Sequence, residues 1–261
     1  MANLQTELQF AADLVREAGA LTLQYFQQAD VEPDRKADNS PVTVADYESE
    51  RLIREKIAAS FPADGILGEE EGESVGTSGR RWTVDPIDGT KTFIQGVPLY
   101  SVLLGLEEGG EAVVGAIYIP GVDDLVVAAR GEGCFWNGSP TSVSDVSDLS
   151  DAFLVYTSCN NFYRAGGGGE QVLERLIPAC REMRSWGDAY GYVLVATGRA
   201  DVMLDPLINP WDLVPLLPVI HEAGGSITDW TGKSPPPGAG WPNCVATNGG
   251  LEARVLDLLK V

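Results

Sequence analysis

The sequence predicts a layered fold of the α+β or α/β class. Three patterns support this prediction: two amphipathic helices in the first 60 residues, several short strands between residues 99 and 136, and alternating strands and helices after residue 151. Such alternation is typical of sheets covered by helices. With 261 residues, 44% of them hydrophobic, the chain can bury a sizeable core. We expect one unit, 1–261, made of an α+β half (1–145) and an α/β half (146–261).

The N-terminal half is expected to begin with two helices. Apolar residues recur at helical spacing through the first 28 residues, and residues 44–60 show a similar pattern before Pro62. Two short strand-like segments follow, ILG before GEE and WTV before DPIDG. A sheet meander is then predicted from four segments separated by glycine-containing turns: YSVLLGLEE, EAVVGAIYIP, DDLVVAAR and GCFW.

The C-terminal half is expected to alternate between the two kinds of element. The predicted strands are FLVY, REMRSW, DVML, SIT and NCVAT. The predicted helices are EQVLERLIPAC, DAYGYVLVATG, WDLVPLLPVIHEAG and LEARVLDLL. This order indicates a sheet with helices packed against it.

Composition and charge argue against several classes of partner. A formal net charge of −20 disfavours nucleic acids and anionic membranes. The sequence shows neither a secretory signal nor an apolar run long enough to span a bilayer, and its four cysteines form no CxxC pair. We therefore expect a cytoplasmic protein, which must gather cations locally if it handles an anion.

Acidic residues stand where predicted strands end and where predicted helices begin. Strand ends precede Glu69, Glu70, Asp85 and Asp88, and helix starts contain Asp46 and Asp212. Each alone is also explained as a turn, a solvated acidic loop or a helix N-cap. Together they favour a metal cluster, because Mg²⁺ prefers oxygen ligands and rigid element ends can fix two ions a few Å apart.

The segment DPIDGT, residues 85–90, is expected to hold metal and phosphate together. Pro86 stiffens the turn, so Asp85 and Asp88 can converge and the Ile87 carbonyl can become a further oxygen ligand. Gly89 and Thr90 then begin a short helical turn, whose backbone N–H groups can bind phosphate oxygens.

The segments GEE, WTVDPIDGTKTF and PWDLVPLLPVIHEAGG, in this order, resemble the motifs of the inositol monophosphatase superfamily. Members of that family are Mg²⁺-dependent, lithium-sensitive phosphomonoesterases. The resemblance runs from SPVTVAD to EAGG. It implies a layered αβαβα sandwich of the inositol monophosphatase and fructose-1,6-bisphosphatase type, a homodimer, and two or three Mg²⁺ ions, with Mn²⁺ as an alternative metal.

The resemblance also implies roles for individual residues. The implied metal ligands are Glu69, Asp85, the carbonyl of Ile87, Asp88 and Asp212, with Glu70 supporting them. The implied catalytic residues are Glu69, Thr90 and Asp46, of which Asp46 orients the Thr90 hydroxyl; Gly89 and Thr90 bind phosphate. The implied reaction is direct in-line attack of a metal-activated water on phosphorus, without a covalent enzyme intermediate.

Other phosphatase chemistries lack their residues in this chain. A cysteine nucleophile needs an arginine six positions later, but those positions hold Pro140, Ala165, Trp186 and Gly250. A phospho-aspartyl enzyme needs a DxD pair, which the sequence does not contain. The single histidine, His221, lies nine residues after Asp212 in the same predicted helix and therefore on its opposite face.

The substrate prediction depends on departures from the inositol-type pattern. Thr92 replaces a common asparagine, and Asp205 replaces a glutamate seven residues before Asp212. The segments DGTKTFIQGVP, RSWGDAYGYVLVATGRADVMLDP and NPWDLVPLLPVI resemble the histidinol-phosphate phosphatase branch, which acts in histidine biosynthesis. Since histidinol phosphate carries an ammonium and an imidazole, extra carboxylates would suit its pocket. The candidate substrate residues are Asp188, Ala189, Asp205 and Arg184.

Alternatives remain open for both the residues and the function. Asp188 is also explained as a helix N-cap and Asp205 as a strand-end carboxylate. Inositol-1-phosphate hydrolysis or a broad phosphatase activity is the second functional interpretation. A 3′(2′),5′-bisphosphate nucleotidase or a catalytically silent metal-binding protein on this fold comes after these.

Overall fold

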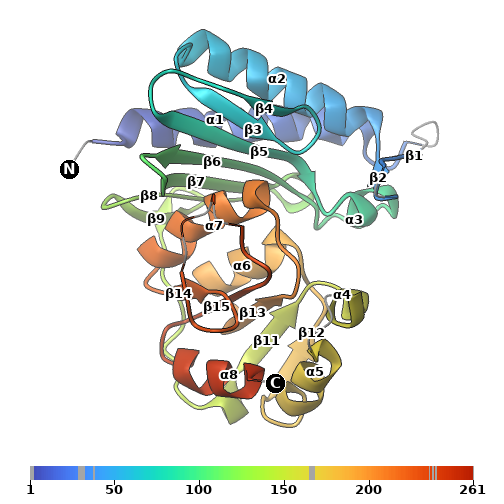
Figure 1. Cartoon of the computed structure of the whole chain (residues 1–261), viewed down its shortest axis with the longest axis vertical. Coiled ribbons are helices and arrows are strands. Elements are labelled where there is room, and N and C mark those ends of the chain that lie inside the picture. The colour runs from blue at the N-terminus through green and yellow to red at the C-terminus, as the bar shows by residue number, and fades with distance from the viewer. Residues whose placement is uncertain are drawn as a thin grey trace.

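The computed structural model describes residues 3–28, 33–37, 39–164, 168–234, 236, 238 and 240–260, and these residues form five layers (Figure 1). Helices α1 (Gln5–Tyr25) and α2 (Val44–Ser60) cover one face of a large sheet. Helices α6 (Ala189–Ala196) and α7 (Pro210–Glu222) lie between this sheet and a smaller one. The outermost layer contains α4 (Cys159–Arg164), α5 (Gly169–Leu176) and α8 (Glu252–Leu259). The expected αβαβα sandwich is therefore confirmed.

The large sheet has eight strands in the order β10-β9-β8-β7-β6-β5-β3-β4. Neighbouring strands are antiparallel except β3 and β5, which are parallel. Strands β6 to β9 are neighbours in chain order, which confirms the predicted meander. The bounds are β3 Gly65–Gly68, β4 Gly72–Ser74, β5 Arg80–Asp88, β6 Ser101–Glu108, β7 Glu111–Ile119, β8 Asp124–Ala129, β9 Gly133–Trp136 and β10 Ser139–Pro140.

The smaller sheet has five strands in the order β12-β11-β13-β15-β14. Strand β11 runs parallel to both β12 and β13, and β15 is antiparallel to its neighbours. The bounds are β11 Phe153–Tyr156, β12 Glu182–Arg184, β13 Val202–Asp205, β14 Ser226–Thr228 and β15 Cys244–Thr247. The remaining elements are β1 (Asp34–Arg35), β2 (Pro41–Val42), α3 (Thr90–Ile94) and two 3₁₀ turns, Pro120–Val122 and Leu149–Asp151.

Helix α7 belongs to the C-terminal half of the chain but packs on the large sheet. Gly105 and Gly115 are paired across β6 and β7 and form the contact surface for this helix. A Cβ added at Gly115 would lie 2.0 Å from the Pro215 carbonyl oxygen, and one at Gly105 would lie 2.8 Å from the Pro215 nitrogen. The two glycines therefore allow the backbone of α7 to lie directly against the sheet.

The sequence prediction was wrong about the local structure of DPIDGT. Strand β5 does not end before this motif but continues through Asp88. Asp85 pairs with Leu103 and Asp88 with Ser101, so three steps along β5 match two steps along β6, as in a β-bulge. Proline and aspartate favour turns in isolated sequence, but here pairing with β6 keeps the segment in the sheet.

Other elements confirm or shorten the predicted ones. Helix α2 has the predicted bounds, whereas α1 ends at Tyr25 rather than near residue 28. Strands β4 and β10 and helix α4 were not predicted. Among the described residues, every helix is too short or too polar to cross a bilayer.

Candidate metal and phosphate site

Three carboxylates meet where β5 ends and α7 begins. One oxygen from each of Asp85, Asp88 and Asp212 lies within 4.8 Å of the other two. In a regular strand, residues three apart point to opposite faces of the sheet, and the bulge in β5 changes this relation. The structure brings together these three of the acidic residues grouped in the sequence, but the bulge that aligns them was not predicted.

The first turn of α7 holds Asp212 through one of its two oxygens. Asp212 Oδ2 accepts hydrogen bonds from the backbone nitrogen and side-chain Nδ2 of Asn209, at 3.2 and 3.3 Å. The other oxygen, Oδ1, is buried and has no hydrogen-bond partner among the described residues. A buried carboxylate oxygen without a donor is costly, and a cation would satisfy it.

The charges of the cluster are poorly compensated by the protein itself. Burial raises the pKa of Asp85 well above its usual value, and the charges of Glu69, Asp212 and Asp88 raise it further. Burial also raises the pKa of Asp88, and the charges of Asp188 and Asp212 raise it further. The pKa of Asp212 is raised by burial and by the charge of Glu69. Clustered oxygen ligands with mutual repulsion fit a hard divalent cation such as Mg²⁺.

Glu69 and Glu70 lie next to the cluster and share a lysine. Lys36 Nζ is 2.6 Å from Glu69 Oε1 and 2.7 Å from Glu70 Oε1. The Glu70 side chain is 2% exposed, and burial raises its pKa to about 7 even though Lys36 opposes the shift. Lys36 was not predicted from the sequence, because one lysine in a polar loop carries no recognisable pattern.

Replacing Lys36 by glutamine is expected to strengthen Mg²⁺ binding. The ammonium group occupies the Glu69 oxygen that the metal site predicted from the sequence requires, and glutamine removes this charge while nearly keeping the length. Isothermal titration should show about tenfold tighter binding, the equivalent of one charge-assisted hydrogen bond. Lys56→Gln is the control, because Lys56 pairs with Glu17 on the surface at 2.6 Å. Equal affinities for the two variants would contradict this expectation.

Asp46 and Thr90 meet beside the Ile87 carbonyl, as the sequence interpretation required. Thr90 Oγ1 donates to Ile87 O at 3.2 Å and lies 3.5 Å from Asp46 Oδ1. The capping box of α2 holds Asp46, whose Oδ2 accepts from the backbone nitrogen and hydroxyl of Thr43 at 2.8 and 2.7 Å. Burial raises the pKa of Asp46 to about 6. The Thr90 hydroxyl is thus oriented between two acceptors.

Gly89 links the cluster to α3 and lies against Asp188. Its φ of +83° is the left-handed conformation that glycine adopts without strain. A Cβ at this position would lie 2.8 Å from Asp188 Oδ2. Any larger residue would therefore disturb both the start of α3 and the position of Asp188.

Two of the candidate substrate residues contact the site directly. Asp188 Oδ2 accepts from the Thr92 hydroxyl at 3.4 Å, and its side chain does not cap α6. The Ala189 N–H donates to Asp88 Oδ2 at 2.6 Å, and this oxygen also accepts from Ser101 Oγ at 2.8 Å. Thr92 and Asp188, both singled out in the sequence, are therefore hydrogen-bond partners.

Asp205 and Arg184 occupy different surroundings. Asp205 is buried at the end of β13, where it accepts from Leu207 N at 3.2 Å. Its pKa lies well above the usual value because of burial, with Asp188 and Asp212 adding to the shift. Arg184 is exposed on β12 and forms an ion pair with Glu182. No described contact joins Arg184 to the carboxylate cluster.

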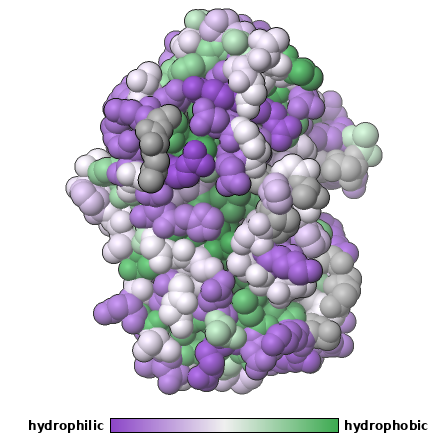
Figure 2. Space-filling view, turned by 60° about the vertical axis from the view of Figure 1, so that its left-hand side comes forward, coloured by the Kyte–Doolittle hydropathy of each residue, from purple (hydrophilic) through white to green (hydrophobic). Residues whose placement is uncertain are grey.

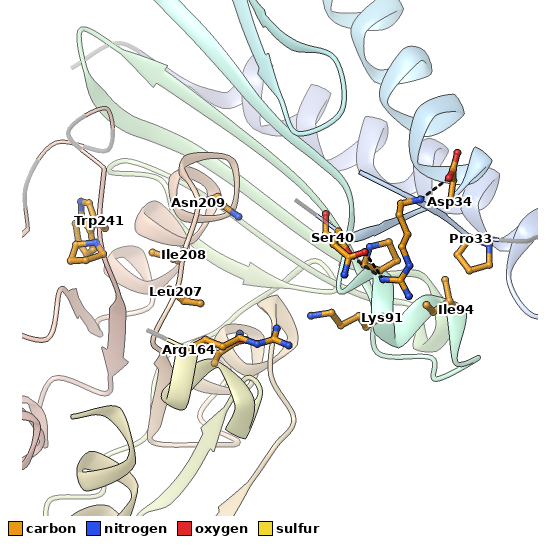
Figure 3. A pocket seen from close by; sticks show the side chains of 15 residues that line it. Pro33, Asp34, Ser40, Lys91, Ile94, Arg164, Leu207, Ile208, Asn209 and Trp241 are labelled. Carbon is orange, nitrogen blue, oxygen red and sulfur yellow. Dashed lines mark hydrogen bonds between the residues drawn. The ribbon is translucent and has the colours of Figure 1, made fainter. Parts of the chain in front are cut away.

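A cavity of about 1050 Å³ opens beside α3. Lys91, which follows Thr90 in the chain, lines this cavity. Asn209, which donates a hydrogen bond to Asp212, lines it as well. Figure 3 shows Lys91 and Arg164 pointing toward the same part of this cavity from opposite sides. The cationic lining can attract an anion into an otherwise acidic protein.

Hydrophilic residues cover much of one face of the molecule, most densely over its upper half (Figure 2).

Comparisons with known proteins relate the chain to one family of proteins. Residues 3–260 match the model of the inositol monophosphatase family. The histidinol-phosphatase of Chlorobaculum parvum is 43% identical over 227 residues, 87% of each chain, and that of Mycobacterium tuberculosis is 38% identical over 97% of this chain and 98% of its own. An inositol monophosphatase structure from Thermotoga maritima superposes with a TM-score of 0.88 at 30% identity, covering 97% of this chain and 96% of its own.

Proposed function

The chain belongs to the inositol monophosphatase family, and on that premise we propose that it is a Mg²⁺-dependent phosphatase that hydrolyses L-histidinol phosphate to L-histidinol and phosphate. As a member of this family it is a phosphoric monoester hydrolase that acts on a small phosphorylated substrate. The observation that carries the proposal is the position of Asp188, which adds a carboxylate beside the trio Asp85, Asp88 and Asp212, with Asp205 buried at the end of β13 close enough to interact electrostatically with Asp188 and Asp212. The names of the relatives from Chlorobaculum, Mycobacterium and Streptomyces, at 35% identity or more, support the same substrate.

The proposed metal ligands are Glu69, Asp85, the Ile87 carbonyl, Asp88 and Asp212, with Glu70 beside them. When bound, Mg²⁺ would lower the pKa of a water molecule and neutralise charge on the phosphoryl group. The two donors to Asp88, Ser101 and Ala189, hold its carboxylate in one orientation. We propose two or three ions, with Mn²⁺ as an alternative.

The protein's own groups would position the phosphate and the attacking water. The backbone N–H groups of Gly89 and Thr90 are the proposed phosphate donors. The Thr90 hydroxyl, which donates to Ile87 O or to Asp46, has lone pairs left to accept a hydrogen bond from water. Asp46 and Glu69 complete the proposed catalytic set. No covalent intermediate on the enzyme is required.

Selectivity for a cationic alcohol would come from the second half of the chain. Asp188 is fixed by Thr92, and its carboxylate would attract the ammonium or imidazolium group of histidinol phosphate. Asp205 contributes to the same negative field. Ala189 and Arg184 complete the proposed substrate residues; Arg184 would have to leave Glu182 to reach the substrate.

A panel of phosphate esters tests the substrate assignment. With Mg²⁺ present, kcat/KM is expected to be at least about tenfold higher for histidinol phosphate than for inositol-1-phosphate, since one charge-assisted contact corresponds to that factor. Fructose-1,6-bisphosphate and 3′-phosphoadenosine-5′-phosphate complete the panel, and excess EDTA should abolish all turnover. A reversed preference for inositol-1-phosphate would overturn the substrate but not the phosphatase class.

Inositol-1-phosphate hydrolysis is the second candidate. The inositol-1-monophosphatase of Rhizobium meliloti is 37% identical over 202 residues, 76% of this chain, which is close to the values for the histidinol-phosphatases. Against it, Thr92 and Asp205 depart from the residues that inositol-type enzymes commonly carry. The same panel decides between the two.

We also propose that the protein is a cytoplasmic homodimer, inhibited by lithium, without nucleic-acid or membrane partners. Its net charge of −20 supports the absence of anionic partners. Light scattering after size-exclusion chromatography tests the dimer, and lithium titration of the hydrolysis tests inhibition.

A further inference from the structure

Helix α2 carries a row of charged residues on its inner face. Asp46, Glu50 and Arg54 are spaced by four residues and therefore lie on the same side of the helix. Glu50 is completely buried, and the Arg54 side chain is 11% exposed. A buried carboxylate is costly unless it is paired and fully hydrogen-bonded, so the partners of Glu50 reveal what it holds.

The partners of Glu50 are backbone groups of the turn between β3 and β4. Glu50 Oε2 accepts from the N–H of Glu70 at 2.8 Å, and Oε1 accepts from the N–H of Glu71 at 3.1 Å. Oε1 also accepts from Arg54 Nε at 2.7 Å, while Arg54 Nη2 donates to the carbonyl of Gly72. The pair thus binds the backbone of three consecutive residues.

Close approach between the helix and this turn depends on Gly68. A Cβ at Gly68 would lie 2.0 Å from Glu50 Oε1. The Glu50 carboxylate therefore lies directly against Gly68, the residue that precedes Glu69. On the other side of the same turn, Lys36 binds the side chains of Glu69 and Glu70.

From these contacts we infer that Glu50, held by Arg54, is a positioning residue that fixes the segment Glu69–Glu70 for metal binding. This inference rests on the proposed function, because it takes Glu69 as a metal ligand. Glu50 acts only through the backbone of the turn. Mutation of a group that orients a metal ligand commonly weakens metal binding 10- to 100-fold.

Glu50→Gln tests this inference against a matched control. Glutamine keeps the shape, but it offers one accepting oxygen where the carboxylate has two, so one of the two N–H bonds is lost. Glu107→Gln is the control: Glu107 is likewise buried and accepts from an arginine, Arg81 Nε, at 2.7 Å, but it lies on β6 outside the turn. Both variants remove the charge of a buried glutamate that pairs with an arginine, and both should lose similar thermal stability.

The decisive measurement is Mg²⁺ affinity by isothermal titration, together with kcat as a function of Mg²⁺ concentration. Glu50→Gln is expected to weaken binding about tenfold or more and to recover most of its kcat at saturating Mg²⁺, whereas Glu107→Gln should stay within about twofold of the wild type. Arg54→Lys keeps the positive charge but cannot contact Glu50 and the Gly72 carbonyl at the same time. It is the second variant and should weaken binding about threefold.

The outcomes separate this inference from the proposed function. Wild-type affinity in Glu50→Gln, or equal weakening in Glu50→Gln and Glu107→Gln, overturns the positioning role alone. A wild-type protein that binds no Mg²⁺ overturns the proposed function and this inference together. If Glu50→Gln does not fold, unchanged affinity in Arg54→Lys overturns the role.

Discussion

Replacing Asp88 by asparagine is expected to reduce kcat/KM by about 10³-fold or more while leaving the fold intact. Asparagine removes one ligand charge from the cluster, and the loss of several kcal/mol of transition-state stabilisation corresponds to this factor. The asparagine carbonyl can still accept from Ser101 and the Ala189 N–H, so the local structure should persist. Hydrolysis of the best ester of the panel, measured with saturating Mg²⁺, gives the value.

The same variant should be more stable than the wild type in the absence of metal. Asp88 is repelled by Asp188 and Asp212, and the amide removes this repulsion, so thermal unfolding in EDTA should shift upward by about 2 °C or more. Asp13→Asn is the control, because Asp13 is exposed on α1, where it accepts a hydrogen bond from Gln9 at 2.9 Å. Retained activity in Asp88→Asn, or a lower melting temperature in EDTA, would contradict the metal assignment.

Gly89→Ala is expected to reduce kcat/KM by about 100-fold. The left-handed backbone at φ +83° disfavours alanine, and its Cβ would meet Asp188 Oδ2 at 2.8 Å. The start of α3 and the Asp188 carboxylate must then move apart. Since a displacement of about 1 Å in a positioned group can cost about 10²-fold, the loss of activity should be far larger than the loss of stability can explain.

Gly79→Ala separates strain from displacement. Gly79 has a nearly identical φ of +80°, but an added Cβ meets no atom within 4 Å. Both variants should therefore lose a similar amount of stability, about 1 kcal/mol by denaturant titration, but only Gly89→Ala should lose activity. A fully active Gly89→Ala variant would contradict the proposal that phosphate or substrate binds against this turn.

The elements of the fold were predictable where local pattern and tertiary structure agree. Residues 44–60 have helical apolar spacing and are followed by Pro62, and they form α2 with those bounds. The four segments of the meander are rich in apolar residues and are separated by glycine-containing turns, and they form β6 to β9. Signals contained within about ten residues were sufficient for these elements.

The site was predictable as a set of residues but not as a geometry. Asp85 and Asp88 were grouped because they share a motif, yet the bulge that aligns them depends on pairing with β6. Lys36 and Glu50 were missed because their partners lie 33 and 20 residues away along the chain. A charged residue at every fourth position on the buried face of α2 was a usable signal for Glu50.

The packing of α7 against the glycines of β6 and β7 has a consequence for synthesis of the protein. Asp85 and Asp88 leave the ribosome more than a hundred residues before Asp212, so the nascent N-terminal half carries its acidic motif without the third carboxylate. Only after Pro215 has docked against Gly105 and Gly115 does the trio exist. The close approach of helix and sheet thus makes assembly of the carboxylate trio a late event, which requires synthesis of the chain through α7.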